Sequence, residues 1–488
     1  MKIDFTHQWS IDTALCFVPI TEDESSEVIL SRLANENGLI KEFLSKKSIA
    51  KLHILIDQKF YVLIKVNASK SFSAITADFR KVIREVKDFP SGNWAIDLTT
   101  ITDKAFTNVL ARAWVHACVV SLQKIGKNKT TEELFHCLDS DKAHLQLVTP
   151  YADDIREDVL QQVVVANAQL NAMTLGNAPS NKKDINFLTA YCEVMARKAG
   201  LEIEIFDQDR LMVEGFKALL AVNRGSEQPA RFILLKYNMS ASDLPLVALV
   251  GKGVIFDTGG INLKPSDNLF LMKSDMCGAA AVLGAAEAIA LNHRKIRLLA
   301  AIPLTDNAID AKSTKPGDVI GSYNGKTIEV IDTDAEGRLC LADALSYISR
   351  NYSPDYIIDI ATLTGSAARA LGHHYAALFS PDENFQNILR TAGQITGEKL
   401  WPLPLDDDYK EDLHSDVADL ANFSNKPTAG AISAALFLKE FVDDPNRWAH
   451  IDIAGTAFTS SEFGKQRNAS GFGVQLLYQF VKTIESIY

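Results

Sequence analysis

The feature that most constrains the fold of this chain is a series of short apolar runs in its second part. After residue 180, helical segments such as 278–291 and 339–350 separate these runs. Near-continuous apolar strands between helices are typical of parallel strands that are buried on both faces. We therefore expect a central mixed, largely parallel sheet covered by helices. The predicted strands lie within 201–206, 246–257, 296–303, 326–331, 356–363 and 448–455.

Polar residues follow several of these predicted strands. Asp257, Asp334 and Thr362 stand at strand ends, with glycine-rich turns beside them. In open α/β sheets the ligand crevice lies beyond the carboxyl ends of the strands. The sequence therefore predicts a polar site at that edge of the sheet.

The pattern divides the chain into three regions. Residues 1–150 alternate strand-like and helical runs, which predicts a small N-terminal α/β domain. Residues 151–184 begin with an acidic helical segment, and we interpret them as a helical connector. Residues 185–488 then form the larger C-terminal α/β domain. A length of 488 residues is ordinary for two or three domains.

Charge and cysteine usage narrow the class of protein. The formal net charge is −11, which argues against non-specific nucleic-acid binding because such binding requires clustered Lys and Arg. The six cysteines include no C-x-x-C pair, and we interpret them as buried free thiols in a reducing compartment. They are Cys16, Cys118, Cys137, Cys192, Cys277 and Cys340.

Neither a signal peptide nor a membrane span is predicted. The N-terminal residues include acids and have no apolar central region, unlike a signal peptide. The longest apolar stretch, 277–291, is short, contains Glu287 and predicts a buried helix. We expect a cytoplasmic protein without membrane association.

An acidic stretch interrupts apolar sequence at 328–345, IEVIDTDAEGRLCLADAL. It places Asp332, Asp334, Glu336 and Arg338 at every second position. If 327–338 is extended, these side chains share one face, where three carboxylates would repel one another. A divalent cation would remove that repulsion. The alternative is a solvated strand edge that leads into a helix, whose first turn favours acids.

A calcium-binding loop is a further alternative for the same stretch. D-x-D-x-E-G, with Asp343 at the twelfth position, nearly fits an EF-hand. Glu336 replaces the usual Asp or Asn, however, and Asp343 replaces the usual bidentate Glu. The preceding run is strand-like, whereas an EF-hand requires a helix there.

A second polar cluster lies in 250–281. Lys252 interrupts an apolar strand, Asp257 ends it, and Lys264 and Asp275 follow on the next loop. The D-T-G at 257–259 resembles an aspartic protease motif, but that chemistry requires two such carboxylates and the chain has one D-T-G. A lone lysine in a strand is usually a snorkelling edge residue. Lys252 could ligate a metal only if it lay beside the carboxylates.

Taken together, several motifs make the chain similar to the leucyl aminopeptidase (cytosol aminopeptidase) family. They are VGKGVIFDTGG, LMKSDMCGAAAV, KPGDVI, NGKTIEV, DTDAEGRL, IATLTG and HIDIAG, and their order and spacing agree across roughly 185–488. The resemblance implies a dinuclear metallo-exopeptidase that removes N-terminal residues from peptides. Residues 185–488 would then be a catalytic metallopeptidase domain.

The resemblance also implies a ligand set for two divalent ions, zinc or manganese, with magnesium or cobalt exchanging at the looser site. One ion would be held by Lys252, Asp257, Asp275 and Glu336. The other would be held by Asp257, Asp334 and Glu336, with the backbone carbonyl of Asp334 assisting. Mostly oxygen ligands fit this loose selectivity, because hard ligands do not select zinc strongly.

The remaining site residues carry over in the same way. The resemblance implies that Lys264 stabilises the developing oxyanion, and that Arg338 holds a bicarbonate ion that acts as general base. An apolar pocket is implied for the first residue of the substrate, which suggests broad specificity favouring Leu and Met. Its residues would be Met272, Thr362, Leu363, Gly365 and Ala454.

The sequence departs from the usual pattern of this family at two places, and two alternative functions stay open. Asp332 stands where the family usually has Asn, and the loop 305–318 lacks the usual pattern. The family is hexameric, so we expect a homohexamer. A non-catalytic hexameric scaffold or DNA-binding regulator on the same fold is the main alternative, and a calcium-binding module is the other.

Overall fold

The computed structural model describes two compact units, residues 1–167 and 168–488. The boundary falls within helix α5 (Ala152–Asn177), inside the predicted connector. The structure describes every residue of the chain except 1, 8–12, 22–37, 47, 49, 57, 87, 90, 91, 126, 127, 130–137, 139–142, 425, 427 and 461.

The first unit is built on a six-stranded, mostly parallel sheet in the order β1-β6-β5-β2-β4-β3, with only the β3–β4 pair antiparallel among its described strands. Helices α3 and α4 pack on it around the buried side chains of Phe17, Phe79, Trp94 and Trp114. The elements are β1 (Lys2–Thr6), β2 (Leu15–Ile20), α2 (Gly38–Ser45), β3 (Lys51–Ile56), β4 (Lys59–Lys65), α3 (Phe72–Glu85), β5 (Asn93–Asp97), α4 (Lys104–Val120) and β6 (His144–Val148).

The second unit contains a nine-stranded mixed sheet. Its order is β16-β15-β18-β14-β9-β11-β8-β7, and β10 pairs with β11. The pairs β18–β14, β14–β9, β9–β11 and β10–β11 are parallel, so the predicted mixed, largely parallel sheet is confirmed. The strands are β7 (Glu202–Phe206), β8 (Arg231–Tyr237), β9 (Leu246–Gly251), β10 (Gly253–Asp257), β11 (Arg297–Asn307), β14 (Tyr356–Ala361), β15 (Ala376–Phe379), β16 (Leu400–Pro402) and β18 (Trp448–Asp452).

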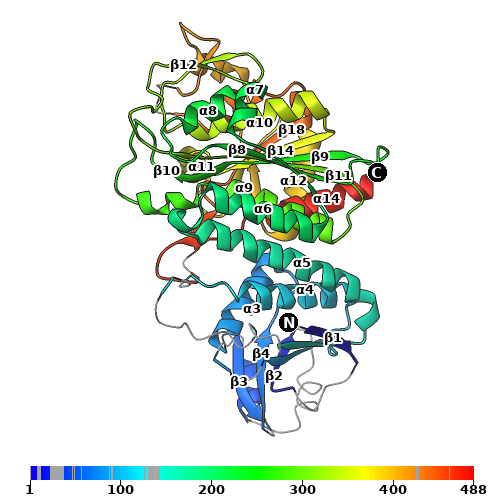
Figure 1. Cartoon of the computed structure of the whole chain (residues 1–488). Helices are drawn as coiled ribbons and strands as arrows, with labels where there is room; N and C mark the ends of the chain where they lie inside the picture. Colours follow the sequence, from blue (N-terminus) through cyan, green and yellow to red (C-terminus); the bar gives the residue numbers. More distant parts are fainter. Residues whose placement is uncertain are drawn as a thin grey trace. The chain divides into compact units, whose positions relative to one another are not determined.

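Helices cover both faces of this sheet, as Figure 1 shows. Helices α8 and α10 lie on one face, and α9 lies on the other with α14 and α12 behind it. The longer helices are α6 (Ile185–Ala199), α9 (Cys277–Leu291), α10 (Glu336–Tyr352), α12 (Glu383–Thr396), α13 (Gly430–Lys439) and α14 (Val474–Ile487). The shorter ones are α7 (Gln208–Glu214), α8 (Lys217–Asn223) and α11 (Gly365–Leu371), with 3₁₀ turns η2 (Ser180–Lys182), η3 (Leu269–Ser274), η4 (Asp407–Leu413) and η5 (Pro445–Arg447).

Two predicted strands differ in the structure. The run 246–257 is not one strand: it breaks at Lys252 into β9 and β10. The predicted strand within 326–331 is the shorter β13 (Thr327–Glu329), and α10 already begins at Glu336. The hypothesis that 327–338 is extended is therefore not met. Strand β13 belongs to a small sheet with β12 (Val319–Gly321) and β17 (Leu420–Ala421), and β19 (Phe458–Ser460) pairs with β20 (Asn468–Ala469).

The EF-hand alternative is contradicted by the position of Asp343. Its carboxylate is completely buried and accepts backbone N–H groups from Ala218, Leu219 and Tyr323 at 2.7–2.9 Å. It therefore caps the start of α8 and cannot be the twelfth ligand of a calcium loop. A strand also stands where an EF-hand requires a helix.

The apolar stretch 277–291 forms the predicted buried helix, α9. Among the described residues, one helical stretch, 269–291, is long and apolar enough to cross a membrane, and 78% of its most apolar window is buried in the protein. Such burial is that of a core helix. The five described cysteines are buried and free, and Cys137 lies outside the described residues.

Replacing Asp343 by alanine tests the capping role. Asp343→Ala leaves two buried N–H groups and one partly buried N–H group without an acceptor, so we expect it to lower the free energy of unfolding by about 3 kcal/mol. Urea denaturation followed by tryptophan fluorescence measures the change. Asp243→Ala, at an exposed position, is the matched control and should stay within about 0.5 kcal/mol of the unchanged protein. Equal unfolding midpoints for both variants would contradict the capping role.

Candidate active site

The polar site lies where the parallel strands of the larger unit end. Lys252 follows β9, Asp257 ends β10, Thr362 follows β14 and Asp452 ends β18. The backbone N–H of Lys252 donates to Ile360 O at 3.1 Å, which ties the first of these ends to the strand beside it. The predicted position of the crevice, beyond the carboxyl ends of the strands, agrees with this arrangement.

Lys252 lies between two of the predicted ligands. Its Nζ is 2.7 Å from Asp275 Oδ2 and 2.8 Å from Glu336 Oε1, and all three side chains are buried. This close approach requires Gly337, since a Cβ there would lie 2.5 Å from Lys252 Cε. Lys252 is therefore not a snorkelling edge residue, because its ammonium is at the centre of the carboxylate cluster.

Lys264 bridges the other two predicted ligands. Its Nζ lies 2.8 Å from Asp257 Oδ2 and also contacts Asp334 Oδ1. Asp257, Asp334 and Glu336 each offer a carboxylate oxygen, and these oxygens lie within 4.8 Å of one another. The structure thus brings all five predicted metal ligands and Lys264 into one cluster.

Burial and mutual repulsion disfavour the charged form of the carboxylates. Burial raises the pKa of Asp275 well above its ordinary value, and it raises the pKa of Asp334 to about 7 with a contribution from Asp257. Burial and the Asp257 charge also raise the pKa of Glu336. Burial opposes the charge on Lys252 as well, but Asp275, Glu336 and Asp257 outweigh it and raise the pKa of Lys252. The negative charge of the carboxylates in this cluster therefore exceeds the positive charge of its two lysines.

The donor set fits divalent cations. Among the described residues, the buried atoms Asp275 Oδ2, Asp334 Oδ1 and Glu336 Oε1 accept no hydrogen bond of good geometry. Each of them lies close to a lysine ammonium group. Four carboxylates face two ammonium groups, so negative charge remains for a cation to neutralise. Oxygen ligands of this kind suit Mg²⁺, Mn²⁺ and Zn²⁺.

The three acids of the opening stretch have different surroundings. Asp334 and Glu336 face the cluster, from the turn before α10 and from its first residue. Asp332 Oδ1 instead accepts the backbone N–H of Asp334 at 2.8 Å and so closes that turn. An asparagine oxygen would accept the same hydrogen bond, which explains how Asp332 can stand where the resembled family usually has Asn.

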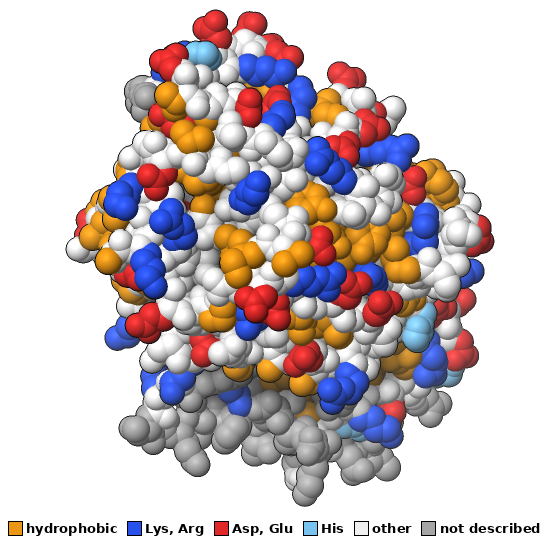
Figure 2. All heavy atoms as spheres, turned by 45° about the horizontal axis from the view of Figure 1, so that its top comes forward, with side chains coloured by type: hydrophobic (Ala, Val, Ile, Leu, Met, Phe, Trp, Pro, Cys, Tyr) orange, Lys and Arg blue, Asp and Glu red, His pale blue; other side chains and the backbone are white. Residues whose placement is uncertain are grey.

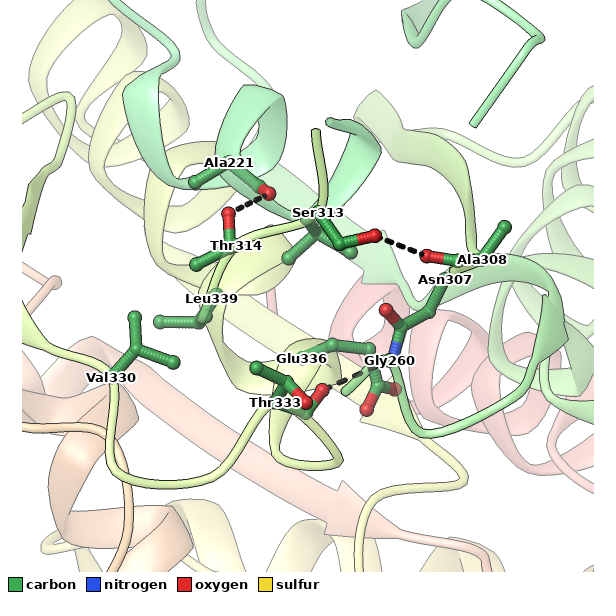
Figure 3. Close-up of a pocket in the computed structure, with 11 residues that line it drawn as sticks. Ala221, Gly260, Asn307, Ala308, Ser313, Thr314, Val330, Thr333, Glu336 and Leu339 are labelled. Carbon is green, nitrogen blue, oxygen red and sulfur yellow. Dashed lines mark hydrogen bonds between the residues drawn. The ribbon is translucent and has the colours of Figure 1, made fainter. Parts of the chain in front are cut away.

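Asn307 and Thr333 support the cluster and were missed by sequence reasoning. Asn307 Nδ2, at the end of β11, donates to Asp257 Oδ1 at 2.8 Å and to Thr333 O at 3.0 Å. Figure 3 shows both residues beside Glu336, among the residues that line a small pocket. The only sequence signal for Asn307 was its place at a strand end, in a loop that departs from the family pattern.

Arg338 is buried in the first turn of α10. Its Nη1 donates to Asn422 O at 2.7 Å, and its guanidinium lies 5.8 Å from the Phe423 ring centre. Its Nε has no hydrogen-bond partner among the residues that the structure describes. Burial lowers its pKa to about 10, so the side chain stays charged at neutral pH. A surface salt bridge, the ordinary role of a helix arginine, is excluded by this burial.

Asp452, another residue that sequence reasoning missed, links the predicted substrate residues. Its Oδ1 accepts the backbone N–H groups of Leu363 (3.2 Å) and Ala454 (3.0 Å), and its Oδ2 accepts Thr364 Oγ1 at 2.7 Å. Two separate turns are thereby held together beside the cluster. Leu363 and Ala454 are half-buried.

The other predicted substrate residues lie near the same strand ends. Thr362 Oγ1 donates to Asp275 Oδ1 at 2.8 Å, which connects this group directly to a predicted ligand. Met272 lies in η3, three residues before Asp275, and Gly365 begins α11. Met272 and Thr362 are half-buried, whereas Gly365 is exposed.

Comparison with known proteins gives one consistent result. The model of the cytosol aminopeptidase family, catalytic domain, matches residues 171–478. A probable cytosol aminopeptidase of Chlorobium limicola is 39% identical over 420 residues, 83% of each chain. Another, of Chlorobium phaeobacteroides, is 38% identical over 465 residues, 94% of this chain and 90% of that protein.

A solved structure agrees with these relatives. The bottromycin maturation enzyme BotP in complex with Mn is 28% identical, with a TM-score of 0.83 over 97% of this chain and 100% of that chain. The family model spans more than half of the chain, and relatives at 38–39% identity cover most of it. The chain therefore belongs to the cytosol aminopeptidase family and is a metal-dependent aminopeptidase, a hydrolase of the leucyl aminopeptidase type.

Proposed function

We propose that this aminopeptidase binds two divalent ions and releases N-terminal residues from peptides, with Leu, Met and other apolar residues preferred. The observation that carries the proposal is the cluster of four carboxylates around Lys252 and Lys264, buried at the strand ends. One ion would be held by Lys252, Asp257, Asp275 and Glu336. The other would be held by Asp257, Asp334 and Glu336, with Asp334 O assisting.

The metals, when bound, polarise the scissile carbonyl and lower the pKa of a water. Zinc or manganese suits the set, and magnesium or cobalt could occupy the looser position because the ligands are mostly hard oxygens. Asn307 and Lys264 both contact Asp257, and the Gly259 N–H donates to its Oδ1 at 2.8 Å. These contacts would hold the bridging carboxylate in one orientation.

Lys264 would stabilise the oxyanion that develops on the attacked carbonyl. Three carboxylates, Asp257, Glu336 and Asp334, outweigh burial and raise the pKa of Lys264, so its ammonium stays charged at neutral pH. It is one-fifth exposed, which leaves it accessible to a substrate. A fixed positive charge in a site of low dielectric stabilises developing negative charge strongly.

Arg338 would hold a bicarbonate ion that serves as general base. Its Nε is a buried donor that finds no partner in the described part of the chain, and its charge is retained because its pKa stays near 10. A carbonate-type anion matches the planar fork of a guanidinium. The position of Arg338 in the first turn of α10 adds the favourable field of a helix N-terminus.

The first side chain of the substrate would bind among Met272, Thr362, Leu363, Gly365 and Ala454. Met272 and Leu363 contribute apolar surface, and Asp452 fixes the backbone of Leu363 and Ala454. An apolar pocket separates side chains that differ by one methylene by only about 1–3 kcal/mol. Broad specificity with a preference for Leu and Met follows.

We further propose a cytoplasmic homohexamer that acts on peptides. Ile261 and Leu263 are exposed on the loop that carries Lys264, and Phe270 is exposed in η3, which follows that loop. A subunit contact would bury such apolar side chains. On the face in Figure 2, acidic and basic side chains are interspersed. With a net charge of −11, this pattern offers no support for the alternative of a DNA-binding regulator.

Removal of metal tests the cofactor proposal. Dialysis against a chelator should abolish hydrolysis of leucine p-nitroanilide, and Zn²⁺ or Mn²⁺ should restore it, because the metals polarise the carbonyl and activate the water. Absorbance of the released nitroaniline follows the reaction. Full activity after the metal content has fallen below one ion per ten chains would contradict the proposal.

Asp334→Asn tests the ligand assignment. The substitution removes a charged ligand oxygen, so we expect kcat to fall about 100-fold or more while the circular dichroism spectrum is unchanged. Asp332→Asn is the matched control two residues away: its side-chain oxygen can still accept the Asp334 N–H, so activity should stay within about twofold. The assignment fails if Asp334→Asn is fully active.

Met272→Ala tests the pocket assignment. Loss of apolar surface should lower the ratio of kcat/KM for leucine over alanine anilide about tenfold. The effect should appear mainly for the larger substrate, and hydrolysis of the alanine anilide should change little. Steady-state kinetics with both substrates measures the ratio, and an unchanged ratio would place Met272 outside the pocket.

A further inference from the structure

Lys183 is a buried cation outside the carboxylate cluster. Its side chain has no exposed surface, and it directly follows the η2 turn. In the described part of the chain, its ammonium donates hydrogen bonds to two main-chain carbonyls and forms no ion pair with a carboxylate. A buried charge without a carboxylate partner costs several kcal/mol, and apolar side chains of similar size often replace buried charges without loss of stability. Packing alone therefore gives no reason for a lysine here.

The ammonium of Lys183 joins the ends of two helices. Nζ donates to Leu175 O at 2.9 Å, in the last turn of α5, and to Lys273 O at 2.6 Å, in the last turn of η3. The last carbonyls of a helix lack intrahelical donors and carry partial negative charge. The two hydrogen bonds from Lys183 satisfy one carbonyl at the end of α5 and one at the end of η3. Burial lowers the pKa of Lys183 to about 7.

The η3 segment held by Lys183 leads directly into the active site. Lys273 stands between Met272, in the proposed substrate pocket, and Asp275, a proposed metal ligand. The Asp275 N–H donates to Met272 O at 3.2 Å, and Ser274 Oγ donates to Leu271 O at 2.7 Å, so the turn is one connected unit. A shift of the Lys273 carbonyl would displace both neighbours together.

We propose that Lys183 is a positioning residue that fixes η3, and through it Asp275 for metal binding and Met272 for substrate selection. The inference rests on the proposed function of these two residues. Residues that orient metal ligands typically alter metal affinity 10–100-fold when they are replaced.

Calorimetric titration of the metal-free, full-length protein with Mn²⁺ tests the proposal without relying on activity. Lys183→Met keeps the length of the side chain and removes the donor. We expect it to bind Mn²⁺ about tenfold more weakly. It should also lower the leucine-to-alanine ratio in kcat/KM, measured at saturating Mn²⁺. Lys182→Met, at the exposed neighbouring position, is the matched control and should change neither quantity.

The outcomes separate this inference from the proposed function. Wild-type Mn²⁺ affinity and selectivity in folded Lys183→Met would overturn the role of Lys183, and so would equal losses in Lys182→Met. If Lys183→Met does not fold, Lys183→Gln carries the same test, because its side chain is too short to reach the carbonyls of both Leu175 and Lys273. Wild-type values in Lys183→Gln overturn the role. Absence of peptide hydrolysis by the unchanged protein would instead overturn the proposed function, whatever the titration gives.

Discussion

Repulsion among four clustered carboxylates, three of them buried and Asp334 partly exposed, is the constraint on which the rest of the larger unit depends. Asp257, Asp275 and the pair Asp334 and Glu336 converge from three segments, and in water their charges would keep them apart. Lys252 and Lys264 neutralise part of this negative charge. Burial of apolar side chains in the sheet and helices compensates for the remaining unfavourable electrostatic free energy. Such an arrangement lowers stability by itself, and it becomes favourable when divalent cations are bound.

The sheet makes this convergence possible because its parallel strands end at one edge. Strands β9, β10, β14 and β18 deliver Lys252, Asp257, Thr362 and Asp452 to that edge, and the turn before α10 adds Asp334. Uncharged polar side chains then fix the orientation of the carboxylates. Asn307 orients Asp257, and Thr362 donates to Asp275. The chemistry therefore depends on loops and strand ends, whereas the buried helices supply rigidity.

Much of this could be predicted from the sequence, because apolar runs, glycine turns and charged interruptions have direct physical meaning. The α/β class, the mixed sheet and the family followed from such patterns, and the predicted ligands do lie in one cluster. The extended conformation of 327–338 was wrong because alternation of charge resembles a strand, whereas turn closure by Asp332 and the start of a helix at Glu336 produce the same spacing. Asn307, Asp452 and Lys183 were missed because their roles come from contacts between segments far apart in the sequence.

Anomalous diffraction from crystals grown with Mn²⁺, measured on both sides of the manganese edge, tests the central claim most directly. The claim is that the carboxylates around Lys252 hold two divalent ions. It predicts two anomalous peaks in each subunit, both in contact with Asp257 and Glu336, with Asp275 and Lys252 at one and Asp334 at the other. A single peak, or peaks that lie away from Asp257 and Glu336, would contradict it.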